Sequence, residues 1–172
     1  MSAPLQIPLQ IRFGDIDSYG HVNNVQYLQF LEDARVQLTH LPLGDAAAEG
    51  VSPEQCFMDL VATDQFTLVG RHEIEYLAPL VYRPYPVAVN IWVTRLGSAS
   101  FDYSYTVAEL DGSMIYAHAS TGMVLVSRIT GRPERLTRAQ LHALRAWQGE
   151  PLAFSRRPPV ASSPDASAGA SS

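Results

Sequence analysis

The stretch from Arg12 to Arg35, RFGDIDSYGHVNNVQYLQFLEDAR, decides the fold that this sequence predicts. Its first half gathers polar and turn-forming residues, and its second half has the apolar spacing of one long helix that runs to about His40. The start of a helix leaves backbone N–H groups unpaired and carries partial positive charge, so it attracts anions and carbonyl oxygens. We therefore expect chemistry where the loop meets the helix.

The polar residues of the loop have two interpretations. Either Asn23 or Asn24 can cap the helix, and Gly20 suits the tight turn that often precedes a cap. A polar turn with an Asn cap therefore accounts for the glycine and one asparagine. It leaves Asp17 and His21 without a role, so a functional loop stays open beside the structural one.

The helix is expected to face water along only one narrow stripe. That stripe consists of Gln26, Gln29, Asp33, Gln37 and His40. The apolar residues that face away from it are Tyr27, Leu28, Leu31, Ala34 and Leu38. Glu32 and Arg35 lie on the mostly apolar side at a spacing that allows an ion pair, and we favour that pair over a catalytic Glu32 because buried charges are usually paired.

The rest of the chain alternates between apolar and polar residues, as strands do. The expected strands cover residues 5–13, 66–77, 87–96, 101–110 and 114–128. Pro8 lacks an N–H and so favours an edge position for the first strand. A strand, a long helix and then four strands joined largely by hairpins predict an α+β fold, in which an antiparallel sheet of about five strands wraps around one long central helix. A short amphipathic helix at 137–147 could cover the open face of the sheet.

The run D-I-D-S-Y-G-H-V-N-N-V-Q-Y-L-Q-F-L-E-D-A-R, which begins at Asp15, resembles the signature of hotdog-fold acyl thioesterases. The group it resembles contains 4-hydroxybenzoyl-CoA thioesterases and long-chain acyl-CoA thioesterases, and its HVNN portion is also similar to acyl-ACP thioesterases. The resemblance covers roughly residues 5 to 136, because IEYLAPL, VTRLGSASFDYSY and TGMVLVSRITGRPERL are similar to strands of that family in the same order. It implies a hotdog fold and hydrolysis of acyl-CoA, or of acyl-ACP, to free acid and thiol.

The resemblance also implies catalytic roles for three residues. In these thioesterases the second Asp of D-x-D-x-x-G acts as nucleophile or as general base on water, and that position is Asp17. Asn24 stands at the helix start, where a backbone N–H would polarise the thioester carbonyl. His21 matches the His of HVNN, but the Asn that plant acyl-ACP enzymes carry two residues earlier is Tyr19 here. A direct role for His21 and a hydrogen bond that orients the loop therefore both stay open.

Substrate contacts are expected from the same loop and helix and from a distant hairpin. The expected binding residues are Gly20, Asn23, Tyr27, Arg95, Ser98 and Ser100. The last three come from the resemblance, which places CoA phosphates or pantetheine at that hairpin. The sequence predicts neither a metal nor a cofactor, since no histidines have a ligand spacing and Cys56 is the single cysteine.

Composition sets the remaining expectations. The 172 residues, 47% hydrophobic with a net charge of −5, predict one soluble domain and argue against a nucleic-acid surface. No stretch resembles a signal peptide or a membrane span, so we expect a cytoplasmic protein. The folded domain is assigned to residues 1–148, and the Ser/Ala/Pro-rich segment 149–172 is expected to be a disordered tail.

Hotdog sheets pair side by side, so the resemblance implies a homodimer or homotetramer whose active sites are shared between copies. Two other functions remain open: a non-catalytic acyl-binding or dimerisation module, and a hotdog hydratase or dehydratase. The presence of Asp17 in its full loop argues against the module. No Asp/His pair has the spacing that a hydratase requires.

Overall fold

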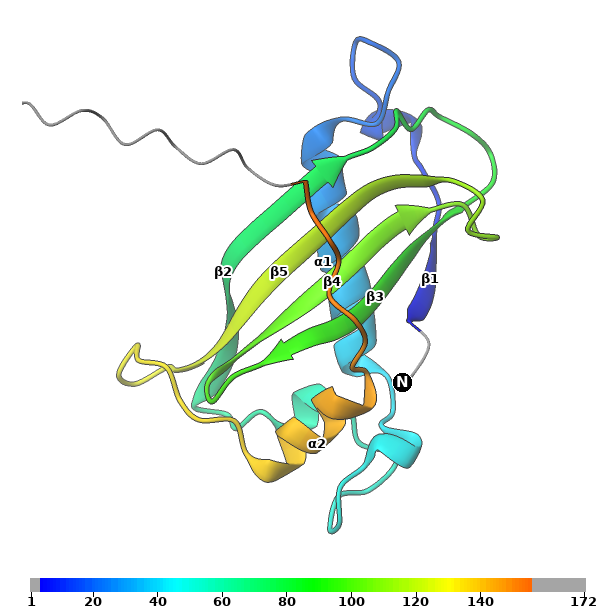
Figure 1. Cartoon of the computed structure of the whole chain (residues 1–172). Helices are drawn as coiled ribbons and strands as arrows, with labels where there is room; N and C mark the ends of the chain where they lie inside the picture. The colour runs from blue at the N-terminus through cyan, green and yellow to red at the C-terminus, as the bar shows by residue number, and fades with distance from the viewer. Residues whose placement is uncertain (1–3, 156–172) are drawn as a thin grey trace, which may run out of the picture.

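The computed structural model describes residues 4–155, which form a five-stranded antiparallel sheet with one long helix packed on it (Figure 1). The strands are β1 (Leu5–Leu9), β2 (Gln65–Tyr76), β3 (Val87–Leu96), β4 (Ser100–Ala108) and β5 (Ile115–Ser127). The helices are α1 (Asn24–His40) and α2 (Arg138–Ala146), with short 3-10 turns η1 (Phe13–Asp15), η2 (Gly44–Ala46) and η3 (Phe57–Leu60). The strand order is β1-β3-β4-β5-β2, and the arrangement confirms the predicted hotdog fold.

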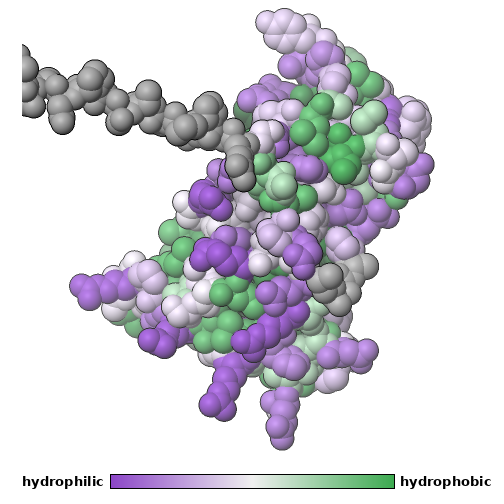
Figure 2. Space-filling model, viewed as in Figure 1, coloured by the Kyte–Doolittle hydropathy of each residue, from purple (hydrophilic) through white to green (hydrophobic). Residues whose placement is uncertain are grey.

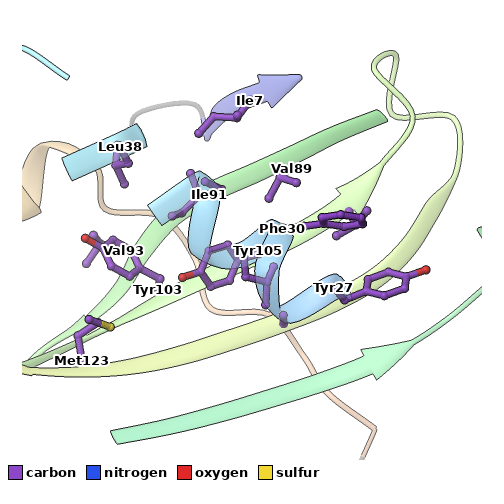
Figure 3. Close-up of a cluster of buried hydrophobic side chains, with 14 of the residues drawn as sticks. Ile7, Tyr27, Phe30, Leu38, Val89, Ile91, Val93, Tyr103, Tyr105 and Met123 are labelled. Carbon is purple, nitrogen blue, oxygen red and sulfur yellow. The ribbon is translucent and has the colours of Figure 1, made fainter. Parts of the chain in front are cut away.

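The core lies between α1 and the sheet. Because side chains alternate along a strand, Phe101, Tyr103 and Tyr105 of β4 face α1, while Asp102 and Ser104 point to the other face. Figure 3 shows the two tyrosine rings lying against α1 within the cluster of buried apolar side chains. Helix α1 has the bounds that its sequence predicted.

The apolar side of α1 is narrower than the sequence predicted. Tyr27, Leu31, Ala34 and Leu38 are all buried, but Leu28 is 39% exposed. Leu28 therefore belongs to the surface of the single chain.

The first strand is shorter than the predicted segment 5–13. It pairs with β3 from Leu5 opposite Ile91 to Leu9 opposite Val87, and β3 begins at Val87. Beyond Leu9 the chain has no strand partner, so it turns into η1, and Phe13 is 80% exposed. Strand β1 is an edge strand, which suits Pro8.

Strand β2 forms the other edge of the sheet. Its pairing with β5 runs from Gln65 to Tyr76, with an irregularity between Val69 and Arg71, and its other side has no strand partner among residues 4–155. The chain reaches the start of β3 by the segment 77–86, which lies beside the Asp17 loop at one end of the molecule. Hydrophobic groups are exposed at that end of the face shown in Figure 2.

The segment that follows α2 crosses the face of the sheet opposite α1 (Figure 1). The Gly149 N–H donates to Val93 O at 2.8 Å, the Trp92 indole donates to Glu150 O at 2.7 Å, and Ser155 bonds to Glu75. A Cβ at position 149 would lie 2.7 Å from Trp92, so only glycine fits this close approach. The predicted tail thus begins with seven residues that lie on the sheet, and its remainder, 156–172, lies outside the described residues.

Within residues 4–155, no helix combines the length and the apolar character that a membrane crossing requires.

Candidate active site

The loop before α1 is a tight, hydrogen-bonded turn. Ile16 and Val22 form an antiparallel bridge, the Asp17 N–H donates to His21 O at 2.8 Å, and the Gly20 N–H donates to Asp17 O at 3.1 Å. Gly20 has a φ of +82°, a conformation that side-chain-bearing residues rarely adopt, so glycine is needed for the turn to close. The backbone therefore holds Asp17 and His21 opposite each other.

The Asp17 carboxylate is fixed on one side only. Its Oδ1 accepts hydrogen bonds from the N–H groups of Tyr19 at 2.8 Å and His21 at 3.2 Å. Its Oδ2 has no hydrogen-bond partner among the described residues, and the side chain is only partly buried. One oxygen thus orients the carboxylate while the other stays available for chemistry.

Asp15, two residues earlier, is held in the opposite way. It is 2% exposed, and its carboxylate accepts from the Arg12 N–H at 2.7 Å and from the Arg12 guanidinium at 3.0 Å. Its backbone carbonyl accepts from the Asn23 N–H at 2.8 Å. These contacts tie the loop to the helix start.

The start of α1 presents one free backbone donor. Asn23 is the N-cap, and its side-chain oxygen accepts from the Val25 N–H at 3.1 Å. Asn24 is the first helical residue, and its N–H has no acceptor within residues 4–155. On the other side of that residue, the Tyr76 hydroxyl donates to the Asn24 carbonyl at 3.2 Å. The free N–H can therefore donate to a carbonyl oxygen of a bound substrate.

These groups line one open cavity of about 420 Å³. Its lining consists of Asp17, His21, Val22, Asn24, Tyr27 and the run Tyr76–Leu80. The Val22 N–H donates to Leu80 O at 2.7 Å, which holds the run against the loop. A carboxylate, an imidazole and a helix N-terminus thus share a cavity with apolar walls.

The aromatic wall of this cavity is neutral. Tyr27 is 3% exposed, and its ring meets that of Tyr76 edge to face with centroids 5.1 Å apart. Burial, together with the neighbouring tyrosines, raises the pKa of Tyr27 to about 12. Tyr27 therefore stays protonated in the physiological range and adds no charge beside Asp17.

The structure divides the predicted site residues into two groups. Asp17, His21, Asn24 and Tyr27 line the cavity, and Gly20 and Asn23 shape the backbone around it. The hairpin residues do not join them.

Arg95 and Ser100 line a separate cavity of about 480 Å³ on the face of the sheet opposite α1. Arg95 is engaged there in a bidentate pair with Asp102, at 2.7 and 3.0 Å. Ser98 lies outside both cavities, and its backbone carbonyl accepts a hydrogen bond from the Leu136 N–H. In a single chain the hairpin is therefore remote from Asp17.

Sequence reasoning missed the run Leu77–Leu80 as part of the site. The backbone here contacts the loop, since Leu80 O accepts from the Val22 N–H and the next residue, Val81, forms an antiparallel bridge with His21. The Glu32–Arg35 pair is present but long, with Arg35 Nη2 3.7 Å from Glu32 Oε1.

Comparisons with known proteins identify the family of the chain. The family model described as the Thioesterase-like superfamily matches residues 11–148. No curated protein sequence matches the chain.

Several solved structures share the fold. The PA2801 protein of Pseudomonas aeruginosa is 30% identical, with a TM-score of 0.61 over 78% of this chain and 92% of its own. The PA5185 protein of the same organism is 27% identical, with a TM-score of 0.67 over 85% and 92%. A thioesterase from Thermus thermophilus, solved with coenzyme A and zinc, is 25% identical, with a TM-score of 0.63 over 87% and 98%. With the family model matching most of its length, this chain belongs to the thioesterase-like superfamily.

Proposed function

We propose that the protein is an acyl-CoA thioesterase, with Asp17 as the reacting carboxylate and the Asn24 N–H as the donor that polarises the thioester carbonyl. The proposal rests on the Asp17 carboxylate. Its Oδ1 accepts hydrogen bonds from two backbone N–H groups, whereas its Oδ2 has no partner among the described residues. Membership of the thioesterase-like superfamily supports thioesterase activity. The start of α1 can stabilise the oxyanion that forms during acyl transfer.

Two balanced routes fit these atoms. As a general base, Asp17 Oδ2 takes a proton from water, the water oxygen adds to the carbonyl carbon, and the C–S bond breaks to release the thiol after proton return. As a nucleophile, Oδ2 itself attacks, the thiolate leaves, and water hydrolyses the resulting anhydride. In both routes the Asn24 N–H donates to the oxygen that gains negative charge.

A single-turnover reaction in water labelled with heavy oxygen tests the nucleophilic route, which is established if the label appears in the Asp17 carboxylate. General-base catalysis places the label in the acid released by the first turnover. Nucleophilic attack places unlabelled Asp17 oxygen in that acid when water then attacks the Asp17 carbonyl, and the label is found in the protein.

Both the backbone and the side chain of His21 contribute to the site. Its N–H and carbonyl both bond to Asp17, and its side chain lines the cavity. We assign it the role of holding the loop, with proton transfer to the leaving thiolate as the alternative. His21→Gln distinguishes these roles, since only proton transfer would give a pH profile that depends on the ring.

A homodimer or tetramer that builds its sites across an interface accompanies this proposal. Strand β2 is an edge strand of 12 residues that offers a row of N–H and C=O groups to a second copy. Phosphates of CoA bound at Asp17 could meet Arg95, Ser98 and Ser100 only if a second copy supplied that hairpin, because the two cavities lie on opposite faces of one chain. Sedimentation at micromolar concentration should then show no monomer.

The decisive experiment measures thiol release from a panel of acyl-CoAs and acyl-ACPs by the full chain. We expect faster release from fatty acyl-CoAs than from hydroxybenzoyl-CoA, because the HVNN sequence is similar to that of acyl-ACP thioesterases. Binding without release would indicate the acyl-binding module. Addition of water to enoyl-CoA without release would indicate a hydratase.

A further inference from the structure

A second cavity, here called the inner pocket, lies between the C-terminal half of α1, the start of β2 and η3. Its volume is about 410 Å³. Its apolar wall includes Phe57, Leu68, Phe101 and Met123. Such a wall suits a hydrocarbon chain.

Two polar groups in this wall lack partners. Arg35 is 8% exposed, and its Nη1 is buried with no hydrogen-bond partner among the described residues. Tyr103 is fully buried, and its hydroxyl likewise has no partner within residues 4–155. Leaving a buried donor unpaired costs free energy, so each unpaired group in a native structure calls for an explanation. A ligand oxygen in the pocket would supply the acceptor that both donors lack.

The orientation of the tyrosines agrees with a polar end to this pocket. Tyr103 and Tyr105 lie side by side with ring centroids 6.2 Å apart, and Figure 3 shows both hydroxyls pointing away from Tyr27, toward the end where Met123 lies. Tyr103 lines the inner pocket and Tyr105 does not. Burial raises the pKa of Tyr103, so its hydroxyl stays neutral and can donate.

The charge on Arg35 is already balanced. Its Nη2 lies 3.7 Å from Glu32 Oε1, and the Glu32 side chain, which is 64% exposed, also borders the pocket. A ligand carboxylate would therefore compete with Glu32, whereas a hydroxyl or carbonyl oxygen can accept from Arg35 and Tyr103 without repulsion. The donor set favours a neutral oxygen.

We infer that the inner pocket receives the far end of the acyl chain, and that Arg35 and Tyr103 select chains that carry a hydroxyl or carbonyl oxygen there. Both cavities lie between α1 and β2, one at Tyr27 and Tyr76 and the other at Arg35 and Leu68. Asn24 and Arg35 are about 16 Å apart along the helix axis at 1.5 Å per residue. This assignment of a substrate class rests on the proposed function, since it takes the thioester end to lie at Asn24.

The test uses thioethers of CoA, which bind as acyl-CoAs do but cannot be hydrolysed. Calorimetry on the full wild-type chain compares dodecyl-CoA thioether with its ω-hydroxy and ω-carboxy derivatives. We expect the ω-hydroxy compound to bind roughly 3- to 10-fold more tightly than the unsubstituted one, the effect of one or two hydrogen bonds. Equal affinity, as a bound water satisfying the donors would give, overturns the inference, and so does tightest binding by the ω-carboxy compound.

The variant Tyr103→Phe removes only the unpaired hydroxyl. It should retain the affinity for the unsubstituted compound, lose the preference for the ω-hydroxy compound, and melt no lower than the wild type, because no hydrogen bond within the described chain is lost. Tyr116→Phe is the control, since it removes a buried hydroxyl at a separate cavity, beside Arg83 and Glu109, and should keep the preference. A preference retained in Tyr103→Phe, or lost equally in both variants, contradicts the inference.

The two proposals fail in different ways. Thiol release from unsubstituted acyl-CoAs without any preference for an oxygen at the far end would remove the inner-pocket inference and leave the thioesterase proposal standing. Absence of thiol release from every substrate would remove the proposed function whatever the thioethers do.

Discussion

The two ends of the loop before α1 hold their aspartates in opposite ways. On the β1 side, Asp15 is buried and its carboxylate is occupied by the N–H and guanidinium of Arg12. On the α1 side, Asp17 is partly exposed in a cavity and keeps one oxygen free. Two carboxylates of the same loop thus have different chemical capacities, because one is saturated with donors and the other is only oriented by them.

The largest expected effect comes from Asp17→Asn. The amide oxygen can still accept from the Tyr19 and His21 N–H groups, so the loop should keep its shape and its melting temperature. The charge that attacks or takes a proton is lost, so turnover should fall by ~10²–10⁴ while acyl-CoA still binds. Thiol release, ligand binding and melting are measured on one preparation.

The control for this variant is Asp45→Asn, which makes the same chemical change at an exposed position in η2 and should leave turnover unchanged. A stable Asp17→Asn protein with turnover within a few-fold of the wild type would remove Asp17 from the mechanism. It would reopen the possibility that Glu32 is the reacting carboxylate.

Asp15→Asn should show the reverse pattern. The new amide group would place donors against the Arg12 donors in a buried position, and the loss of a buried, charge-assisted contact should lower the free energy of unfolding by about 1–3 kcal/mol. Turnover per folded molecule should stay near the wild-type value. Chemical denaturation checks the first expectation and thiol release the second; a stable but inactive Asp15→Asn protein would mean that the comparison assigns the two carboxylates wrongly.

The paired asparagines sharpen the same comparison at the helix start. Asn23→Ala removes the cap to the Val25 N–H and should cost about 1 kcal/mol of stability. Asn24→Ala keeps the free backbone N–H at the helix start, so both stability and turnover should change little. If Asn24→Ala lowered turnover strongly while the melting temperature stayed constant, the side-chain amide rather than the N–H would be the group that polarises the carbonyl.

Local signals explain what the sequence could predict. The cap, the bounds of α1 and the glycine at position 20 depend on neighbours within a few residues; the structure places the cap at Asn23, one of the two asparagines considered, and Gly20 in the expected turn. The bounds of β3 were also predicted correctly, because its apolar alternation ends at a hairpin turn. The helix start and the bounds of these elements can therefore be predicted from residues that are close together in the sequence.

The misplaced features depend on partners distant in the sequence. Strand β1 ends at Leu9 because β3 has no residue left to pair with it, and Gly149 joins the sheet through Val93 and Trp92. The inner pocket brings Arg35 of α1 beside Tyr103 of β4, which no local pattern in either segment indicates. Pairing and packing between segments determine such contacts, and a single sequence carries little signal for them.

The smallest expected effect concerns Tyr76, whose hydroxyl donates to the Asn24 carbonyl at 3.2 Å. Tyr76 is 47% exposed, so water can replace the lost bond in Tyr76→Phe, and stability should fall by only about 0.5 kcal/mol. If the hydroxyl helps to hold the helix start against Asp17, kcat should fall a few-fold with KM unchanged, since the loss would appear only when the oxyanion forms. If Tyr76 merely lines the cavity, KM should rise and kcat should stay constant. Tyr82→Phe, at a similarly exposed tyrosine outside the cavity, should change neither constant, and a decrease in kcat there as well would show that the measurement does not report on the Asn24 contact.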